Sequence, residues 1–362
     1  MVKILIFTLG SFIFTFGLAP LIIGFLYRFQ IREEIRRNGP KSHLVKEGTP
    51  TMAGLLIVLA VSLINLLFNL SRAETYLPIF ALVTAGILGV LEDVFKIHRK
   101  SFIVELFRHP SSLRNHVGFS PWGRTRRILL LPWRLFKETF RALGSNDEVG
   151  LKSYQKILFQ LAIGTFLAFW FYYKLGWETV WLPLLGNVNI GIWYPVLVIS
   201  IFTFFLNSVG ITDGLDGLAG GLLALLFTSL GLIALTQNQI GLALFCATVV
   251  GSLLAFLYFN FYPARVFMGN VGSHALGATA SVVAMMLHKE IVLLVLGGVF
   301  VMELISVVLQ VSAVKFYKRR VFRMAPIHHH FEILGWPETK VTMRFWLVGA
   351  IFSLFGVLIS QL

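Results

Sequence analysis

Apolar residues dominate ten stretches of the chain, and short polar segments separate them. The stretches run over roughly 4–26, 51–70, 76–95, 155–174, 192–208, 217–236, 239–259, 272–287, 290–314 and 341–361. An α-helix needs about 20 apolar residues to cross a hydrocarbon core of about 30 Å, and most of the stretches approach this length. We therefore predict an all-α, polytopic integral membrane protein with about ten transmembrane helices. The first stretch lacks a small-residue cleavage site, so we expect a retained span and not a removed signal peptide.

Lysine and arginine gather in the connections that follow odd-numbered spans. The first and last of these connections carry Arg28, Arg32, Arg36, Arg37, Lys41 and Lys46, and then Lys315, Lys318, Arg319, Arg320 and Arg323. The connection after the third span is the most basic, whereas those near 71–75, 175–191, 237–238 and 288–289 hold few cations. Cytoplasmic loops are enriched in Lys and Arg, so the basic segments are expected in the cytoplasm and both termini in the periplasm.

The composition agrees with a membrane protein. Of the 362 residues, 57% are hydrophobic and only 13% are charged, against about 25% in a typical soluble domain. A net charge of +14 would suggest nucleic acid in a soluble protein, but here the cations lie in a few short connections and reflect topology. We expect no nucleic-acid partner. The single cysteine, Cys246, excludes an internal disulfide and is expected to be a buried hydrophobe.

Residues 97–149 form an unusually long basic cytoplasmic insertion within a single transmembrane domain that spans 1–362. The stretch at 124–143 mixes Arg and Lys with Trp, Leu and Phe at roughly helical spacing. We predict an amphipathic helix that lies in the membrane interface, and a solvated linker helix is the alternative.

Five polar clusters fall on the predicted cytoplasmic side, where charges near a membrane often serve a site. Lys46 lies in "SHLVKEGTPTMAG", which would otherwise be an ordinary helix start with Pro50 in its first turn. Glu92 and Asp93 are adjacent in "LEDVFK" at the end of the third span. Carboxylates there oppose the helix dipole, which favours a role in Mg²⁺ binding or proton transfer over simple helix-end charge.

Two glycine-containing loops hold the third and fourth clusters. Asp213 and Asp216 stand in "NSVGITDGLDGLAGG", where glycines allow a ligand to approach the backbone and one Asp could simply cap the next helix. Asn260, Phe267 and Asn270 stand in "FNFYPARVFMGNVGS". Phe267 could stack on a base or anchor the loop at the interface, and Asn270 would be a weaker metal ligand than a carboxylate.

The fifth cluster is the run His328, His329 and His330 in "MAPIHHHFE". Consecutive residues of a helix point about 100° apart, so three adjacent histidines do not converge on one metal ion. A thiolate-rich zinc site is excluded by the single cysteine. Contacts to phosphate fit better, and a solvated interfacial stretch is the alternative.

In this order and on one side of ten spans, the motifs resemble the phospho-N-acetylmuramoyl-pentapeptide-transferase family. This family belongs to the polyprenyl-phosphate N-acetylhexosamine-1-phosphate transferases. The segments "SHLVKEGTPTM", "TDGLDGLA", "FMGNVGS" and "MAPIHHHFE…PETKV…RFW" carry the resemblance, which covers nearly the whole chain outside 97–149. The triple histidine is typical of the muramoyl branch.

The resemblance implies a reaction, a metal and a set of residues. Phospho-N-acetylmuramoyl-pentapeptide would pass from its UDP-linked donor to undecaprenyl phosphate, forming lipid I and UMP at the bacterial inner membrane. The implied catalytic residues are Glu92, Asp93, Asp213 and His328. Mg²⁺ would be bound by Asp93 and Asn270. The implied substrate-binding residues are Lys46, Lys156, Asn207, Asp216, Asn260, Phe267 (stacked on uracil), Gln310, His329 and His330. The oligomeric state is open, with a homodimer as one expectation.

Four positions depart from the family pattern. The family usually has Asp at positions 92 and 270, Asn at position 210 and Gly at position 53, where this chain has Glu92, Asn270, Gly210 and Ala53. Asn270 can offer a carbonyl oxygen to Mg²⁺ but lacks the charge of a carboxylate. One alternative is therefore a homologue that binds nucleotide-sugar or polyprenyl phosphate with little turnover. Another is a transferase for a related UDP-N-acetylhexosamine, and a transporter or channel would require polar residues at mid-span.

Overall fold

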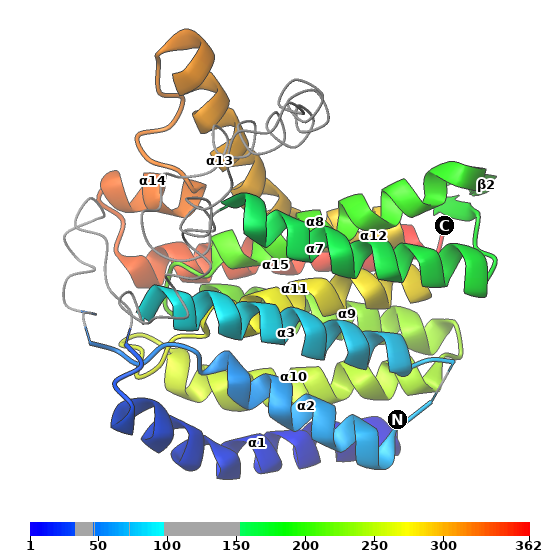
Figure 1. The fold of residues 1–362 in the computed structure, drawn as a ribbon, viewed down its shortest axis with the longest axis horizontal. Helices are drawn as coiled ribbons and strands as arrows, with labels where there is room; N and C mark the ends of the chain where they lie inside the picture. Colours follow the sequence, from blue (N-terminus) through cyan, green and yellow to red (C-terminus); the bar gives the residue numbers. More distant parts are fainter. Residues whose placement is uncertain (33–45, 47, 72, 98–152) are drawn as a thin grey trace, which may run out of the picture.

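The computed structural model describes residues 1–32, 46, 48–71, 73–97 and 153–362. Within them, most of the long helices lie side by side with their axes along the long direction of the molecule, whereas the helix Gly298–Tyr317 projects away from the bundle, and both termini lie at the same end (Figure 1). The longer helices are α1 (Val2–Arg28), α2 (Gly54–Phe68), α3 (Tyr76–Ile97), α7 (Ser153–Phe169), α8 (Tyr194–Thr212), α9 (Leu218–Thr236), α10 (Ile240–Asn260), α11 (Gly269–Met286), α13 (Gly298–Tyr317) and α15 (Glu338–Ser360). The shorter elements are η3 (Trp170–Lys174), β1 (Thr179–Leu182), β2 (Gly186–Asn189), η4 (Gly191–Trp193), α12 (Glu290–Leu296) and α14 (Ile327–Ile333).

Every predicted span overlaps at least one helix, but the helices are not equivalent. Eight helices in the described ranges are long and apolar enough to cross a membrane, which defines a multi-pass membrane protein. The other two predicted spans are α2, with 15 residues, and α11. Helix α11 is buried throughout from Val271 to Met286 and packs against α2, α3 and α8. Because its neighbours are helices and not lipid, α11 can be rich in Gly, Ala, Ser and Thr, which allow close helix packing.

Two sequence predictions are corrected by the structure. The predicted span 290–314 is divided into α12 and α13 at Gly297 and Gly298, and paired glycines are a known cause of such breaks. The all-α class omits an antiparallel hairpin, β1–β2, in which Thr179 pairs with Asn189 and Leu182 with Gly186. Strands of four residues are too short to give a clear periodicity, so the sequence marked this segment only as a connection.

The two ends of the bundle differ in character. We call the end that carries Met1 and Leu362 the termini end; it also holds the hairpin and the hydrogen bond from Gln361 to Thr236 (3.2 Å). We call the opposite end, near α14, the motif end, because all five polar clusters lie there. Residues 98–152 lie outside the described residues, so the basic insertion and its predicted helix at 124–143 stay predictions.

Candidate active site

A buried ion-pair group forms at the motif end of α3. Glu92 is 2% exposed, and its Oε1 accepts hydrogen bonds from Lys156 of α7 and ion-pairs with Lys96 one turn later (3.2 Å). Its Oε2 lies 4.0 Å from Nε2 of His274 on α11. Burial would make an unpaired carboxylate very costly, so the two lysines stabilise Glu92 in this position. Helices α3, α7 and α11 thus meet at one carboxylate.

Asp93, next to Glu92, binds the start of α11 instead. The amide of Asn270 donates to Oδ1 of Asp93 (2.8 Å), and the Val271 N–H donates to Oδ2 (3.3 Å). The approach of α3 to this segment depends on Gly89, because a Cβ there would lie 2.3 Å from the carbonyl oxygen of Asn270. A glycine one turn before the acidic pair therefore permits the contact between "LEDVFK" and "FMGNVGS".

Lys46 lies between two carboxylates from distant parts of the chain. Its Nζ donates to Oδ1 of Asp216 (2.6 Å) and to Oε1 of Glu338 (2.5 Å). Backbone N–H groups of Asp216 and Ala264 complete the network, donating to Glu338 (2.6 Å) and Asp216 (2.9 Å). Burial by itself lowers the pKa of Lys46, but the charges of Glu338 and Asp216 outweigh it and raise the pKa above the ordinary 10.5.

Phe267 lies beside this network. The Nζ of Lys46 is 5.9 Å from the centroid of the Phe267 ring. The backbone of Phe267 donates to the Pro50 carbonyl (2.8 Å) and accepts from the Ala53 N–H (2.9 Å). These bonds join the "GTPTMAG" and "VFMGN" segments, so an aromatic ring and an ammonium group face the same part of the motif end.

His328 is buried between α13 and the loop after α8. It is 0% exposed, its Nδ1 lies 3.0 Å from Oε2 of Glu303, and its Nε2 has no hydrogen-bond partner among the residues that the structure describes. A Cβ on Gly214 would lie 2.7 Å from this Nε2, so only glycine fits the position next to Asp213. The imidazole is therefore held at Nδ1, while Nε2 is directed at the "TDGLDG" loop.

The other two histidines have different partners. Nδ1 of His329 lies 2.6 Å from Oε2 of Glu332, and Nδ1 of His330 accepts the N–H of Arg323 (3.2 Å). The rings of His328 and His329 are in edge contact, with their centroids 4.2 Å apart, although the Nδ1 atoms of the three histidines have three different partners. In the described part of the chain, no group of three His, Cys, Asp or Glu side chains is arranged to hold a metal ion.

Three predicted substrate-binding residues make hydrogen bonds within the protein. Asn207 of α8 and Gln160 of α7 exchange hydrogen bonds of 2.8 and 3.2 Å through their side-chain amides. Asn260 accepts the Gly217 N–H (3.1 Å), which fixes the loop before α9. Gln310 bonds the backbone around Phe322, with an N–H to Oε1 distance of 2.9 Å. Asn260 and Gln310 thus hold loops of the motif end, whereas Asn207 joins α8 to α7.

Three residues of the site were missed from the sequence. Glu338 stands in the "PETK" segment, Glu303 interrupts an apolar span, and His274 follows "GNVGS". A glutamate within an apolar span is a signal for a functional or paired position and could have identified Glu303. His274 fills the space beside Gly210, where the family usually has Asn: a Cβ on Gly210 would lie 3.4 Å from its Nε2.

The two predicted magnesium ligands, Asp93 and Asn270, are adjacent, but two side chains do not fill the coordination shell of the ion. Asp93 supplies a carboxylate, and a 180° rotation of the Asn270 amide beside it would present Oδ1 in place of Nδ2. Proteins often hold Mg²⁺ through one or two carboxylates and complete its shell with water and substrate phosphates. The residues therefore fit a magnesium ion that binds together with a phosphorylated ligand.

A helical membrane bundle with buried carboxylates, lysines and histidine gathered at one end defines an integral-membrane enzyme of phosphorylated substrates. Residues 140–288 match Glycosyl transferase family 4. The chain is 38% identical over 357 residues to the phospho-N-acetylmuramoyl-pentapeptide-transferase of Geobacillus sp. (strain WCH70), covering 97% of this chain and 95% of the relative. The proteins of that name from Anoxybacillus flavithermus and Levilactobacillus brevis are 37% and 36% identical, each over 99% of this chain and 98% of the relative. The chain belongs to the phospho-N-acetylmuramoyl-pentapeptide-transferase family, which confirms the resemblance found in its motifs.

Proposed function

We propose that the protein transfers phospho-N-acetylmuramoyl-pentapeptide from its UDP-linked donor to undecaprenyl phosphate. The products are lipid I and UMP, as required for peptidoglycan synthesis. Full-length relatives at 36–38% identity carry the name of this activity. The observation that carries the proposal is the meeting of Lys46, Glu92, Asp216, Asn270 and His328 at one end of the bundle, although they come from five separate segments.

The reaction is a phosphoryl transfer. An oxygen of undecaprenyl phosphate attacks the β-phosphorus of the donor, and the bond from that phosphorus to the bridging oxygen breaks. UMP leaves with the electron pair, and the new diphosphate links lipid and sugar. Such reactions need mainly positioning and neutralisation of phosphate charge, which the charged groups of the motif end can supply.

The nucleotide is proposed to bind near Lys46 and Phe267. Stacking of uracil on Phe267 would leave the diphosphate within reach of the Lys46 ammonium. Lys46 would then exchange its contacts with Asp216 and Glu338 for phosphate oxygens, while Asp216 and Asp213 contact the uridine side. Asn260 and Gln310 are proposed to contribute by holding the loops around this pocket, and Asn207 by joining α8 to α7, in addition to any direct contact.

The acceptor phosphate is proposed to bind near Glu92 and Asp93. Lys156 and Lys96 bring two positive charges to Glu92 and can attract the phosphate of the lipid. Asp93 accepts hydrogen bonds from the Asn270 amide and the Val271 N–H, and it is proposed as the carboxylate that accepts a proton from that phosphate. His328, His329 and His330 would contact the donor phosphates, with Nε2 of His328 directed inward.

Mg²⁺ is the proposed cofactor, with Asp93 and Asn270 as its protein ligands. When bound, a divalent ion neutralises charge on the donor diphosphate. The Asn270 amide contributes an oxygen and no charge, so this chain depends on Asp93 and on substrate oxygens to hold the ion.

The topology proposed from the basic loops places the motif end in the cytoplasm and both termini in the periplasm. Ten spans, including the short α2 and the interior α11, would cross the bacterial inner membrane within a single domain. The eight long apolar helices and the distribution of Lys and Arg support this arrangement. A homodimer stays a prediction.

The proposal is tested with purified full-length protein, UDP-N-acetylmuramoyl-pentapeptide, undecaprenyl phosphate and Mg²⁺. We expect release of UMP in equal amount to lipid I, and loss of both products on chelation of Mg²⁺. Lys156→Met is expected to lower the rate strongly, whereas Lys174→Met, at an exposed lysine of the termini end, should not. Absence of UMP release from the parent would contradict the transferase.

The second candidate function is ligand binding with little turnover, and Asn270 motivates it. If this alternative holds, the parent binds the nucleotide donor without releasing UMP, and Asn270→Asp restores release. A parent rate close to that of Asn270→Asp would exclude it. A transferase for a related UDP-N-acetylhexosamine is tested by replacing the muramoyl donor with UDP-N-acetylglucosamine. Such a transferase would release UMP from this donor, whereas the other two candidate functions predict no release.

A further inference from the structure

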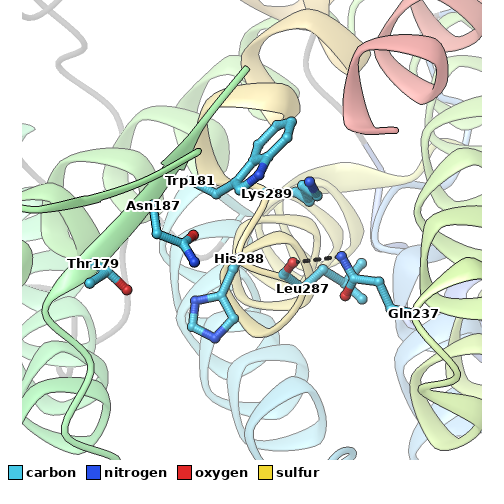
Figure 2. A pocket seen from close by; sticks show the side chains of 7 residues that line it. All are labelled: Thr179, Trp181, Asn187, Gln237, Leu287, His288 and Lys289. Atoms are coloured by element: carbon cyan, nitrogen blue, oxygen red, sulfur yellow. Dashed lines mark hydrogen bonds between the residues drawn. The ribbon is translucent and has the colours of Figure 1, made fainter. Parts of the chain in front are cut away.

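A pocket of about 260 Å³ lies at the termini end, far from the candidate active site. The hairpin, the end of α9 and the connection between α11 and α12 form its walls (Figure 2). Helix α10 connects the two ends with 21 residues, which corresponds to about 30 Å. The pocket is therefore separate from the charged groups proposed to bind the substrates.

Lys289 is the charged residue that lines this pocket. It is 6% exposed, and its Nζ lies over the Trp181 ring. Within the part of the chain that the structure describes, its ammonium group makes no hydrogen bond and no ion pair. A buried ammonium with only an aromatic ring beside it is poorly compensated, because a cation–π contact replaces little of its hydration.

The neighbouring Glu290 does not neutralise Lys289 directly. Glu290 is fully buried, its Oε1 accepts a hydrogen bond from the Tyr194 hydroxyl (3.0 Å), and its side chain does not line the pocket. Burial lowers the pKa of Lys289 to about 8, so the ammonium form still predominates at neutral pH. The pocket thus presents one positive charge.

Neutral hydrogen-bond donors surround this charge. The amide of Asn187 and the hydroxyl of Thr179 line the pocket and have no side-chain hydrogen bond to another described residue. Burial and the nearby Lys289 lower the pKa of His288, so its ring is neutral at neutral pH and offers one N–H. Figure 2 shows Asn187 on the hairpin and His288 on the connection between α11 and α12, with their side chains next to each other.

We propose that this pocket binds a phosphate group, with Lys289 as its cationic contact and Asn187, Thr179 and His288 as hydrogen-bond donors. Lysine binds phosphate as a point charge, and a tetrahedral anion can accept hydrogen bonds from several directions at once. The pocket takes a phosphate and part of an attached ester group. Leu184 and Leu185 at the hairpin turn are 83% and 75% exposed, which favours contact of the hairpin with lipid. The phosphate can belong to a lipid headgroup or be free in solution.

The test uses delipidated full-length protein in neutral detergent, with thermal unfolding followed against inorganic phosphate at constant ionic strength. Retention of phosphatidylglycerol, compared with an uncharged diacylglycerol, is measured by native mass spectrometry. We expect Lys289→Met to weaken binding by about 10- to 100-fold, as for loss of a hydrogen bond to a charged group. Lys289→Arg should retain binding, and Lys174→Met, which removes an exposed lysine at the same end, should leave it unchanged.

The outcomes distinguish the sources of the phosphate. Binding of phosphatidylglycerol alone assigns a lipid headgroup, binding of inorganic phosphate alone assigns a free anion, and binding of both assigns the phosphate group as such. Equal binding by the parent and a folded Lys289→Met protein would overturn the proposal, as would no binding by the parent. UMP release in the same samples is expected to be unchanged by Lys289→Met. A failure of the phosphate-binding proposal would therefore leave the proposed transferase function intact.

Discussion

Glu303 and His328 form a buried pair in which Oε2 of the glutamate lies 3.0 Å from Nδ1 of the histidine. Both side chains are fully buried, one on α13 and the other on α14. The bond to Nδ1 orients the ring and leaves Nε2 facing Gly214, beside the aspartate loop. A glutamate that the sequence presents only as an irregularity in an apolar helix thereby positions the first histidine of the run.

Replacement of Glu303 tests this positioning. Glu303→Ala is expected to lower the free energy of unfolding by about 1.5–3 kcal/mol, because His328 loses a buried hydrogen bond to a charged group. Glu303→Gln keeps an acceptor for Nδ1–H and should lose less stability. Thermal unfolding in detergent and UMP release are the measurements. Glu178→Ala, at an exposed glutamate of the termini end, is the matched control and should change both little; equal effects of Glu303→Ala and this control would contradict the role.

Lys46 should contribute to stability over a wide pH range. Its folded pKa is raised above 10.5, so its stabilising contribution is complete below pH 10.5 and is lost as the pH rises through the folded pKa. Lys46→Met is expected to cost about 1.5–3 kcal/mol at neutral pH, since Asp216 and Glu338 lose a charged donor. The difference between parent and variant should shrink above pH 10.5, as followed by denaturant unfolding. A difference that stays constant into that range would show that packing, and not charge, is responsible.

Asn270→Asp should make the protein respond to Mg²⁺. The change places a second carboxylate within hydrogen-bonding distance of Asp93, so the two negative charges repel each other without a cation. We expect a lower melting temperature in chelator and a recovery on addition of Mg²⁺, worth about 2.7 kcal/mol when the ion is at 100 times its dissociation constant. The parent protein should gain less stability from Mg²⁺ than the Asn270→Asp variant. The same response in Asn270→Ala would place the bound ion elsewhere.

Gly89→Ala is expected to destabilise the contact between α3 and α11. The new Cβ would lie 2.3 Å from the Asn270 carbonyl oxygen, and overpacking of this kind costs about 1–3 kcal/mol. UMP release should fall as well, because the displaced segment carries Asn270. Gly17→Ala in α1 is the matched control, since a Cβ there meets nothing within 4 Å. Equal unfolding temperatures for the two variants would contradict the close approach.

Sequence patterns predicted the helices well because each span is long and continuously apolar. Hydropathy over a whole span does not show local features. The break at Gly297 and Gly298 lies inside a continuous apolar stretch, and the four-residue strands of the hairpin lie in a segment with no marked period. Helix α11 shows a different limit of the sequence patterns. Its small and polar residues are explained by the helices packed around it, and these neighbours are known only from the tertiary structure.

The sequence by itself determined the positions and order of the long apolar helices, the family, and the identity of most charged residues at the motif end. These follow from hydropathy over about 20 residues and from short motifs, both of which are local in the chain. The tertiary structure decided which charges meet. Lys46 pairs with Asp216 and Glu338, and His328 with Glu303, across 170, 292 and 25 positions of sequence. It also decided that Lys289 is buried with no ion pair to another described residue, because the energy of a charge depends on its neighbours in space, which a linear pattern does not specify.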